Sequence, residues 1–218
     1  MDKILIFGGG SKFGLQLSNE MKNLECDVEI ITSTDVQDNS FKVHKVDWLT
    51  LDRSSTEKLC KEFTDVDTII FNQNYSEING LENVSSNKLE MMNNMKKWNQ
   101  GIFINCELPL QVCNSLYLRK CFTNKPKVIW MLSDAINDSK FPNLEYKIQK
   151  YINHEMVDYI NNLNIIKCIG FNPGTMDDEN YYAKAHSLAD VLTRDPLKDT
   201  YYSFDDDLMV IGKEKYFL

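Results

Sequence analysis

The chain has 218 residues, 43% of them hydrophobic and 26% charged, and it carries a formal net charge of -8. This length and hydrophobic content suit one globular domain with a full core, so residues 1–218 are predicted to form a single domain. The acidic balance argues against a protein whose main partner is a nucleic acid or an anionic membrane.

The first segment is predicted to be a strand followed by a glycine-rich turn and a helix. Lys3 to Phe7 read KILIF, an apolar run of strand length, and Leu15 to Leu24 carry apolar residues at roughly helical spacing. These elements form the first half of a dinucleotide-binding fold, in which bare backbone and a helix N-terminus receive the pyrophosphate. The alternative is a tight surface turn. The candidate cofactor-binding residues here are Gly8, Gly10, Ser11, Lys12, Phe13 and Gly14.

A second predicted strand, Val28 to Thr32, ends in Ser33, Thr34 and Asp35. An NAD-selective site usually has a carboxylate at the end of this strand for the ribose hydroxyls, whereas the extra phosphate of NADP favours hydroxyl groups and cations. Ser33 and Thr34, with Thr32 in place of a carboxylate, therefore favour NADP. Asp35 keeps NAD possible.

A third predicted strand, Lys42 to Val46, leads to Asp47. The Asp47 side chain either meets the adenine edge of a cofactor or caps the helix that begins near Asp52. A helix from about Ser54 to Phe63 then leads to a buried strand, Asp67 to Phe71.

The alternation of strands and helices with short connections predicts an α/β protein. We expect a doubly wound Rossmann fold with a mostly parallel sheet of about seven strands and helices on both faces. Ligands of such sheets bind at the carboxyl ends of the strands. Asn72, Gln73 and Asn74 follow the Asp67–Phe71 strand at that position.

Residues Tyr75 to Asn94 are polar and read as a long connection with a partial helix, and a longer helix is predicted from about Lys96 to Leu118. Pro109 lies inside this helix and has no N–H, so the carbonyl of Asn105 loses its helical partner. The freed carbonyl and the Asn105 amide either hold an ordered water or mark a structural kink. A fifth strand, Lys127 to Leu132, ends in Ser133.

The stretch from Asn143 to Asp158 predicts a helix with an apolar stripe at spacings of three and four. Tyr146 and Lys150 are four residues apart and share a different flank. An ammonium one turn from a phenol favours the phenolate and lowers the tyrosine pKa, as acid–base chemistry near neutral pH requires. The alternative is a solvated helix flank. The stripe that is predicted to face the core consists of Leu144, Ile148, Tyr151, Ile152, Met156, Tyr159, Ile160 and Leu163.

The remainder of the chain is predicted to hold a helix from Ala183 to Thr193 and a last strand from Leu208 to Ile211. The apolar run at the N-terminus is too short to span a bilayer, and no signal-peptide cleavage pattern accompanies it, so a cytoplasmic protein is expected. The six cysteines show neither CxxC nor Cys/His metal spacing. We therefore expect free thiols and no metal site.

Taken together, these features resemble a short-chain dehydrogenase/reductase along nearly the whole chain. Phe7 to Gly14 stand where that family has TGxxxGxG, and Asn72 to Asn74 stand at its NAG motif. Ser133 precedes the Tyr146-x-x-x-Lys150 pair by the usual thirteen residues. Asn172, Pro173 and Gly174 match the Pro-Gly after the family's sixth strand, and Asn105 matches its helical asparagine.

The resemblance implies roles for four catalytic residues. Ser133 would hydrogen-bond the substrate carbonyl oxygen, and Tyr146 would pass a proton to that oxygen. Lys150 would lower the tyrosine pKa and hold the nicotinamide ribose. Asn105, with the carbonyl freed by Pro109, would bind a water that links Lys150 to solvent.

The same resemblance implies a nicotinamide dinucleotide as cofactor, with NADP preferred and NAD possible. Lys12 stands at a family glycine and adds a cation near the pyrophosphate. The cofactor would contact residues from every strand end on its path. These are Gly8, Gly10, Ser11, Lys12, Phe13, Gly14, Ser33, Thr34, Asp47, Asn72, Gln73, Asn74, Tyr146, Lys150, Pro173, Gly174 and Thr175.

The expected function is that of an NAD(P)-dependent oxidoreductase that interconverts a carbonyl and an alcohol on a small-molecule substrate. The competing hypothesis is a dinucleotide-binding sensor or scaffold that has the fold without turnover. The family's paired helices and the aromatic residues Trp98, Phe103, Tyr117, Tyr151 and Tyr159 also predict a homodimer or homotetramer.

Overall fold

The computed structural model describes residues 1–75, 88–138, 143–174, 180–193, 201–205 and 208–211. These residues form an eight-stranded sheet in the order β3-β2-β1-β4-β5-β6-β7-β8. Neighbouring strands are parallel except for the β7–β8 pair, which is antiparallel. The order reverses direction between β1 and β4, as in a doubly wound Rossmann-like fold. The predicted fold class is confirmed.

The strands are β1 (Lys3–Phe7), β2 (Asp27–Thr32), β3 (Lys42–Lys45), β4 (Val66–Phe71), β5 (Phe122–Met131), β6 (Lys167–Asn172), β7 (Tyr201–Asp205) and β8 (Leu208–Ile211). The helices are α1 (Lys12–Asn23), α2 (Arg53–Cys60), α3 (Lys88–Ile102), α4 (Leu108–Leu118), α5 (Leu144–Asn162) and α6 (Tyr181–Thr193). A π-helical turn, Phe103–Glu107, joins α3 to α4, and a 3-10 turn, Asp134–Ile136, follows β5.

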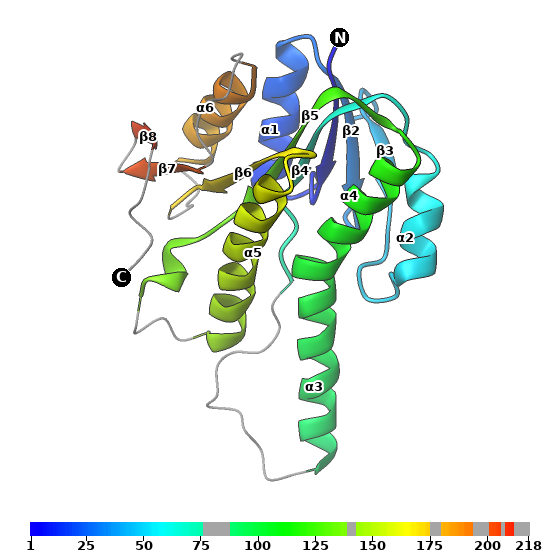
Figure 1. Cartoon of the computed structure of the whole chain (residues 1–218), viewed down its shortest axis with the longest axis vertical. Coiled ribbons are helices and arrows are strands. Elements are labelled where there is room, and N and C mark those ends of the chain that lie inside the picture. Colours follow the sequence, from blue (N-terminus) through cyan, green and yellow to red (C-terminus); the bar gives the residue numbers. More distant parts are fainter. Residues whose placement is uncertain (76–87, 139–142, 175–179, 194–200, 206–207, 212–218) are drawn as a thin grey trace.

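Two hydrophobic clusters cover the two faces of the sheet. One cluster includes residues of α1 and α6, such as Leu17 and Leu188, against Ile30 and Ile129. The other includes residues of α2, α4 and α5, such as Leu59, Leu116 and Val157. Figure 1 shows α1 and α6 together at one side of the sheet and α3 extending beyond its edge.

Most predicted elements lie where the structure has them, with shifts of a few residues at their ends. Strands Lys3–Phe7 and Leu208–Ile211 coincide with the prediction. Helix α3 begins at Lys88 instead of near Lys96. Strand β7, Tyr201–Asp205, was not predicted. Of the predicted connection between Tyr75 and Asn94, residues 76–87 lie outside the described ones.

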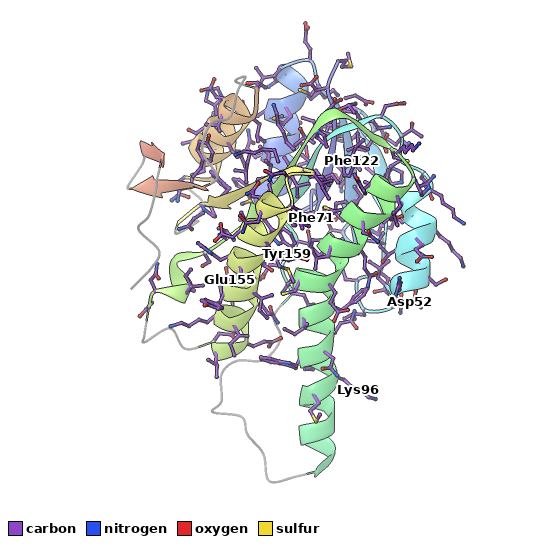
Figure 2. The ribbon with its side chains drawn as sticks, in the orientation of Figure 1. Asp52, Phe71, Lys96, Phe122, Glu155 and Tyr159 are labelled. Carbon is purple, nitrogen blue, oxygen red and sulfur yellow. The ribbon has the colours of Figure 1, made fainter. Side chains whose placement is uncertain are left out.

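The orientation predicted for α5 is wrong. Leu144, Tyr151, Tyr159 and Leu163 of the apolar stripe are exposed, and only Ile160 of that stripe is buried. Figure 2 labels Glu155 and Tyr159 on this helix. The buried face of α5 carries polar side chains instead, namely Glu145, Gln149, Lys150, Asn153 and His154 together with Val157 and Ile160.

The six cysteines are free thiols, as predicted, and all but Cys26 are buried. Cys60, Cys113, Cys121 and Cys168 lie in the cluster under α2, α4 and α5. Burial raises the pKa of Cys60 to about 11 and the pKa of Cys168 to about 12, because an apolar surrounding disfavours the thiolate. No helix within the described part of the chain has the length and apolar character that crossing a bilayer requires.

Candidate functional site

The glycine turn after β1 is tied to the end of β4. Gly8 has a φ of 78°, and a Cβ there would lie 2.7 Å from the backbone nitrogen of Gln73, so this position needs glycine. Asn72 Nδ2 donates to the Gly8 carbonyl oxygen at 3.1 Å and to Ser11 Oγ at 3.0 Å. Ser11 in turn caps α1 by accepting a hydrogen bond from Gly14 N at 3.1 Å. The turn therefore presents a helix N-terminus at the carboxyl edge of the sheet.

The end of β2 packs against the same turn. A Cβ at Gly10 would lie 2.3 Å from Thr34 Oγ1, and that hydroxyl donates to the Gly10 carbonyl oxygen at 3.2 Å. Ser33, Asp35 and Lys12 are exposed. Asp35 forms an ion pair with Lys45 of β3. The Lys45 ammonium lowers the pKa of Asp35.

Asp47 does not cap α2, so that alternative is wrong. Its Oδ1 accepts a hydrogen bond from Leu49 N at 3.0 Å, which shapes the turn after β3. The cap of α2 is Asp52, which forms a capping box with Ser55.

Three predicted catalytic residues lie together beyond the carboxyl end of β5. Asn143 starts α5 by accepting a hydrogen bond from Tyr146 N at 2.9 Å, which places Tyr146 in the first turn. The side chains of Tyr146 and Ser133 share a hydrogen bond. Lys150 Nζ lies 5.4 Å from the centroid of the Tyr146 ring and donates to the Met131 carbonyl oxygen at 2.9 Å. The Tyr146 phenol therefore has the Ser133 hydroxyl and the Lys150 ammonium as neighbours.

The pKa values in this group differ from the expectation. Burial raises the pKa of Tyr146, and the hydrogen bond with Ser133 only partly opposes this, so the predicted lowering is wrong. Burial also lowers the pKa of Lys150 to about 8. The physical cause is the same for both groups, because a surrounding of low polarity favours the neutral phenol and the neutral amine.

Asn105 lies in the π-helical turn and binds the segment after β4. Its Oδ1 accepts from Tyr75 N at 2.9 Å, and its Nδ2 donates to Tyr75 O at 2.7 Å and to Gln149 Oε1 at 2.6 Å. The Asn105 side chain therefore fixes the backbone that leaves β4. The nearby Gln73 side chain donates to the Ile104 carbonyl oxygen at 3.2 Å, which ties β4 to the same turn.

The carbonyl of Asn105 that Pro109 leaves free is bound by a side chain. With its amide nitrogen facing the carbonyl groups, Asn153 donates to Asn105 O at 3.0 Å and to Gln149 O at 3.3 Å. This direct hydrogen bond uses one of the two lone pairs of the carbonyl oxygen for which a water was predicted, and the water itself stays a prediction. The helix accommodates Pro109 by forming a π-helical turn just before it, in which Leu108 N donates to the Phe103 carbonyl oxygen.

The Asn172-Pro173-Gly174 segment lies at the end of β6, as expected. Asn172 is buried, and its Oδ1 accepts from Gly174 N at 3.0 Å. Gly174 has a φ of 63°, a left-handed conformation that favours glycine. Pro173 is buried between them. The predicted cofactor residue Thr175 lies outside the described residues.

Gln149, Asn153 and Lys45 were not among the predicted site residues. Gln149 Nε2 donates to Glu145 Oε1 at 2.9 Å, so a polar row runs along α5 from Glu145 through Gln149 to Asn153. The spacing of four residues was visible in the sequence. Gly101 of α3 makes room for this row, since a Cβ there would lie 2.5 Å from Gln149 Nε2 and from Glu145 Oε1.

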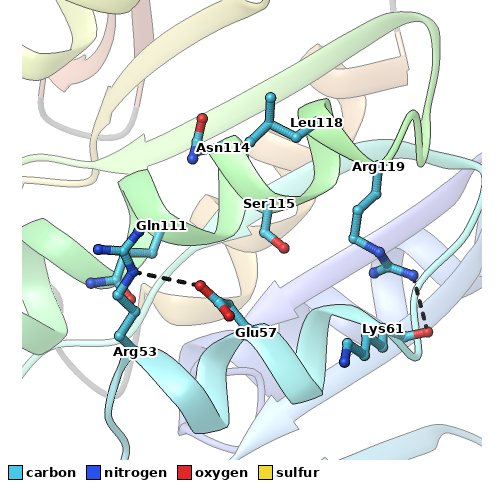
Figure 3. Close-up of a pocket in the computed structure, with 8 residues that line it drawn as sticks. All are labelled: Arg53, Glu57, Lys61, Gln111, Asn114, Ser115, Leu118 and Arg119. Carbon is cyan, nitrogen blue, oxygen red and sulfur yellow. Dashed lines mark hydrogen bonds and ion pairs between the residues drawn. The ribbon is translucent and has the colours of Figure 1, made fainter.

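A separate cavity of about 260 Å³ lies between α2 and α4. Figure 3 shows the ion pair of Arg53 with Glu57 at one end and Arg119 directed at the Lys61 carbonyl oxygen at the other. None of the described residues that were predicted for the site lines this cavity.

No family model matches the sequence, and no curated protein matches it. The fold, in contrast, matches solved structures over nearly the full chain. A variant of a short-chain dehydrogenase/reductase from Serratia marcescens has a TM-score of 0.74 at 14% identity, with 94% of this chain and 95% of that chain covered. The serine dehydrogenase of Escherichia coli has a TM-score of 0.72 at 12% identity, with 97% and 99% covered.

A third solved structure is an oxidoreductase of the short-chain dehydrogenase/reductase family from Brucella ovis, in complex with a partially ordered NAD. Its TM-score is 0.71 at 15% identity, and the match covers 94% of this chain and 99% of that chain. The chain therefore has the fold of these dehydrogenases.

Proposed function

We propose that this protein is an NAD(P)-dependent oxidoreductase that interconverts a carbonyl and an alcohol. The observation that carries this proposal is the group of Ser133, Tyr146 and Lys150 beyond the end of β5. Two of its members share a hydrogen bond, and the third is a buried ammonium 5.4 Å from the phenol ring. The fold, which is that of known dehydrogenases, supports the same proposal.

The residues at the strand ends fit a nicotinamide dinucleotide, with NADP preferred. Gly8, Gly10 and Gly14 let the turn pack tightly against neighbouring protein atoms, and the first turn of α1 that follows offers N–H groups suited to phosphate oxygens. Lys12 adds an exposed cation there. The cofactor, when bound, supplies or accepts the hydride.

The protein's own part in the reaction is orientation and proton transfer. The Ser133 hydroxyl donates a hydrogen bond to the substrate oxygen, and the Tyr146 hydroxyl transfers a proton to the same oxygen in the direction of reduction. Because burial keeps the pKa of Tyr146 raised, the phenol holds its proton until the substrate oxygen becomes basic. Lys150 supplies the nearby positive charge when it is protonated.

We also propose that two or four copies of the chain assemble. Leu144, Tyr151, Tyr159 and Leu163 are exposed on α5. Tyr117 and Leu118 add exposed apolar surface at the end of α4. Large apolar surface of this kind is typical of an interface between subunits.

The proposal is tested by substitution of Tyr146 with phenylalanine. Protein purified without added ligand is first examined by mass spectrometry for a bound dinucleotide, and the reduced cofactors are then used to screen carbonyl compounds. Tyr146→Phe should keep the fold and cofactor affinity, while turnover falls roughly a hundredfold or more, because the positioned acid is lost. Tyr151→Phe, an exposed tyrosine on the same helix, is the control and should retain the parent rate.

Turnover of Tyr146→Phe at close to the parent rate would exclude this mechanism. Cofactor binding without any turnover of the parent protein would favour the alternative of a dinucleotide-binding sensor or scaffold.

A further inference from the structure

Strand β3 carries two lysines whose ion pairs differ in burial. Lys42 Nζ lies 3.1 Å from Glu29 Oε2, and the Glu29 side chain is only 3% exposed. Lys45 pairs with Asp35, whose side chain is 95% exposed. A solvated ion pair contributes little to folding stability. The Lys45–Asp35 pair can therefore open at little cost to the fold, whereas Lys42 neutralises a buried carboxylate.

Lys45 lies beside the end of β2 at the carboxyl edge of the sheet. It is the register partner of Thr32, and the following Val46 N donates to the Thr32 carbonyl oxygen at 2.9 Å. Two residues beyond Thr32, the Thr34 hydroxyl contacts Gly10 of the glycine turn. If a dinucleotide places its pyrophosphate on this turn, as the proposed function requires, its adenosine ribose lies at the edge that carries Lys45 and Asp35.

The hydroxyl groups of Thr32 and Thr34 at this edge are already engaged within the turn. Thr32 Oγ1 and Thr34 Oγ1 are 2.9 Å apart, Thr34 N donates to Thr32 Oγ1 at 3.1 Å, and Thr34 Oγ1 donates to Gly10 O. Lys12 and Lys45 are exposed at the same edge. A phosphate monoester on the ribose carries about two negative charges near neutral pH, so it competes well with one carboxylate for an ammonium.

We propose that Lys45 determines cofactor specificity by binding the 2′-phosphate of NADP, and that Asp35 is the counter-ion which Lys45 exchanges for this phosphate. To bind the phosphate, Lys45 must leave Asp35. This costs little free energy, because the Lys45–Asp35 ion pair is exposed to solvent. This inference rests on the proposed function and adds to it the residue that distinguishes the two dinucleotides.

The test compares the full-length parent protein with Lys45→Met and Asp35→Asn. Calorimetry gives the dissociation constants of adenosine 2′,5′-bisphosphate and adenosine 5′-monophosphate, and nicotinamide fluorescence gives those of NADPH and NADH. Lys45→Met should raise the dissociation constants of the two 2′-phosphorylated ligands roughly tenfold or more, because a charge-assisted hydrogen bond is lost. The values for the other two ligands should stay within about twofold. Asp35→Asn should strengthen NADPH binding, since the competing carboxylate is gone.

Lys58→Met is the matched control, because Lys58 is an exposed lysine on α2 and its removal changes the net charge equally. It should leave all four constants unchanged. Equal effects of Lys45→Met on both dinucleotides, or no effect on either, would overturn the assignment while leaving the proposed function intact. Tighter NADH binding that Asp35→Asn abolishes would also overturn it. A parent protein that binds neither dinucleotide would refute the proposed function and the assignment together.

Discussion

Lys150 is a buried ammonium that donates to a neutral carbonyl oxygen and lies beside an aromatic ring. Its charged form therefore pays a desolvation cost in the folded protein that it does not pay in the unfolded chain. Burial lowers its pKa from 10.5 to about 8. Below pH 8, Lys150 is charged in both the folded and the unfolded chain, so its full desolvation cost lowers the stability of the folded protein. This loss of stability disappears as the pH rises from about 8 to 10.5.

Lys150→Met should therefore be more stable to unfolding than the parent at pH 7, by up to about 3 kcal/mol. The difference should shrink as the pH approaches 10.5. Urea denaturation of both proteins at several pH values measures it. Lys147→Met is the control for removal of a lysine from the same helix, because the Lys147 ammonium binds an exposed carbonyl oxygen. A stability difference that stays constant with pH would contradict the buried-charge interpretation.

The sequence allowed the grouping of Ser133, Tyr146 and Lys150 to be predicted, but not their pKa values. The Tyr146–Lys150 pair depends on local spacing along one helix, and Ser133 was added to it by the resemblance to short-chain dehydrogenases/reductases. The pKa values depend on how deeply the side chains are covered by segments far away in the sequence, such as the π-helical turn, whose Cys106 lies near Lys150. Lys45 was missed for a similar reason, because its pairing with Asp35 requires the register of β2 and β3.

At the scale of elements, α5 shows the limit of periodicity as a guide. Spacings of three and four identify residues that share a face, and they do not say which face another element covers. Here the row Glu145, Gln149 and Asn153 is buried because its hydrogen bonds are made within the protein. Asn105 of the π-helical turn donates to Gln149 and accepts from Asn153, and Gln149 donates to Glu145. Gly101 permits this close approach. The helix was therefore predicted correctly, and its orientation was not.

The hydrogen bond between Asn153 and the freed carbonyl predicts a rescue between two substitutions. Asn153→Leu should destabilise the protein by about 1–3 kcal/mol, because the carbonyls of Asn105 and Gln149 lose their donor. Pro109→Ala introduces an N–H that can bind the Asn105 carbonyl. Added to Asn153→Leu, it should recover roughly 1 kcal/mol of the loss.

Urea denaturation of the two single variants and the double variant completes the cycle. Strictly additive effects would show that Asn153 and Pro109 do not act on the same carbonyl.

At the scale of the whole molecule, the alternation of strands and helices was predictable because each strand–helix unit carries its own apolar pattern. Strand β7 was missed because Tyr201–Asp205 reads YYSFD, which has neither a continuous apolar run nor strict alternation. It becomes a strand by pairing with β6 on one side and β8 on the other. Such a segment takes its structure from the sheet that it joins.

The assembly proposal makes a prediction for two tyrosines of equal exposure. Tyr159 on α5 and Tyr182 on α6 are both 63% exposed. Light scattering at micromolar concentration should give the parent a mass of two or four chains. Tyr159→Glu should reduce this mass, because it places a charge in the proposed interface, and Tyr182→Glu should not. A parent mass of one chain would rule out the proposal.

The buried thiols also give the folded chain a chemical signature. A thiol reacts with an alkylating reagent as the thiolate, and burial both covers Cys60, Cys106, Cys113 and Cys168 and raises their pKa values. Cys121 is buried as well, and Cys26 alone is partly exposed. Five of the six sulfur atoms therefore become reactive only when the surrounding structure opens. The rate at which a reagent modifies them reports how often the core of this protein is exposed to water.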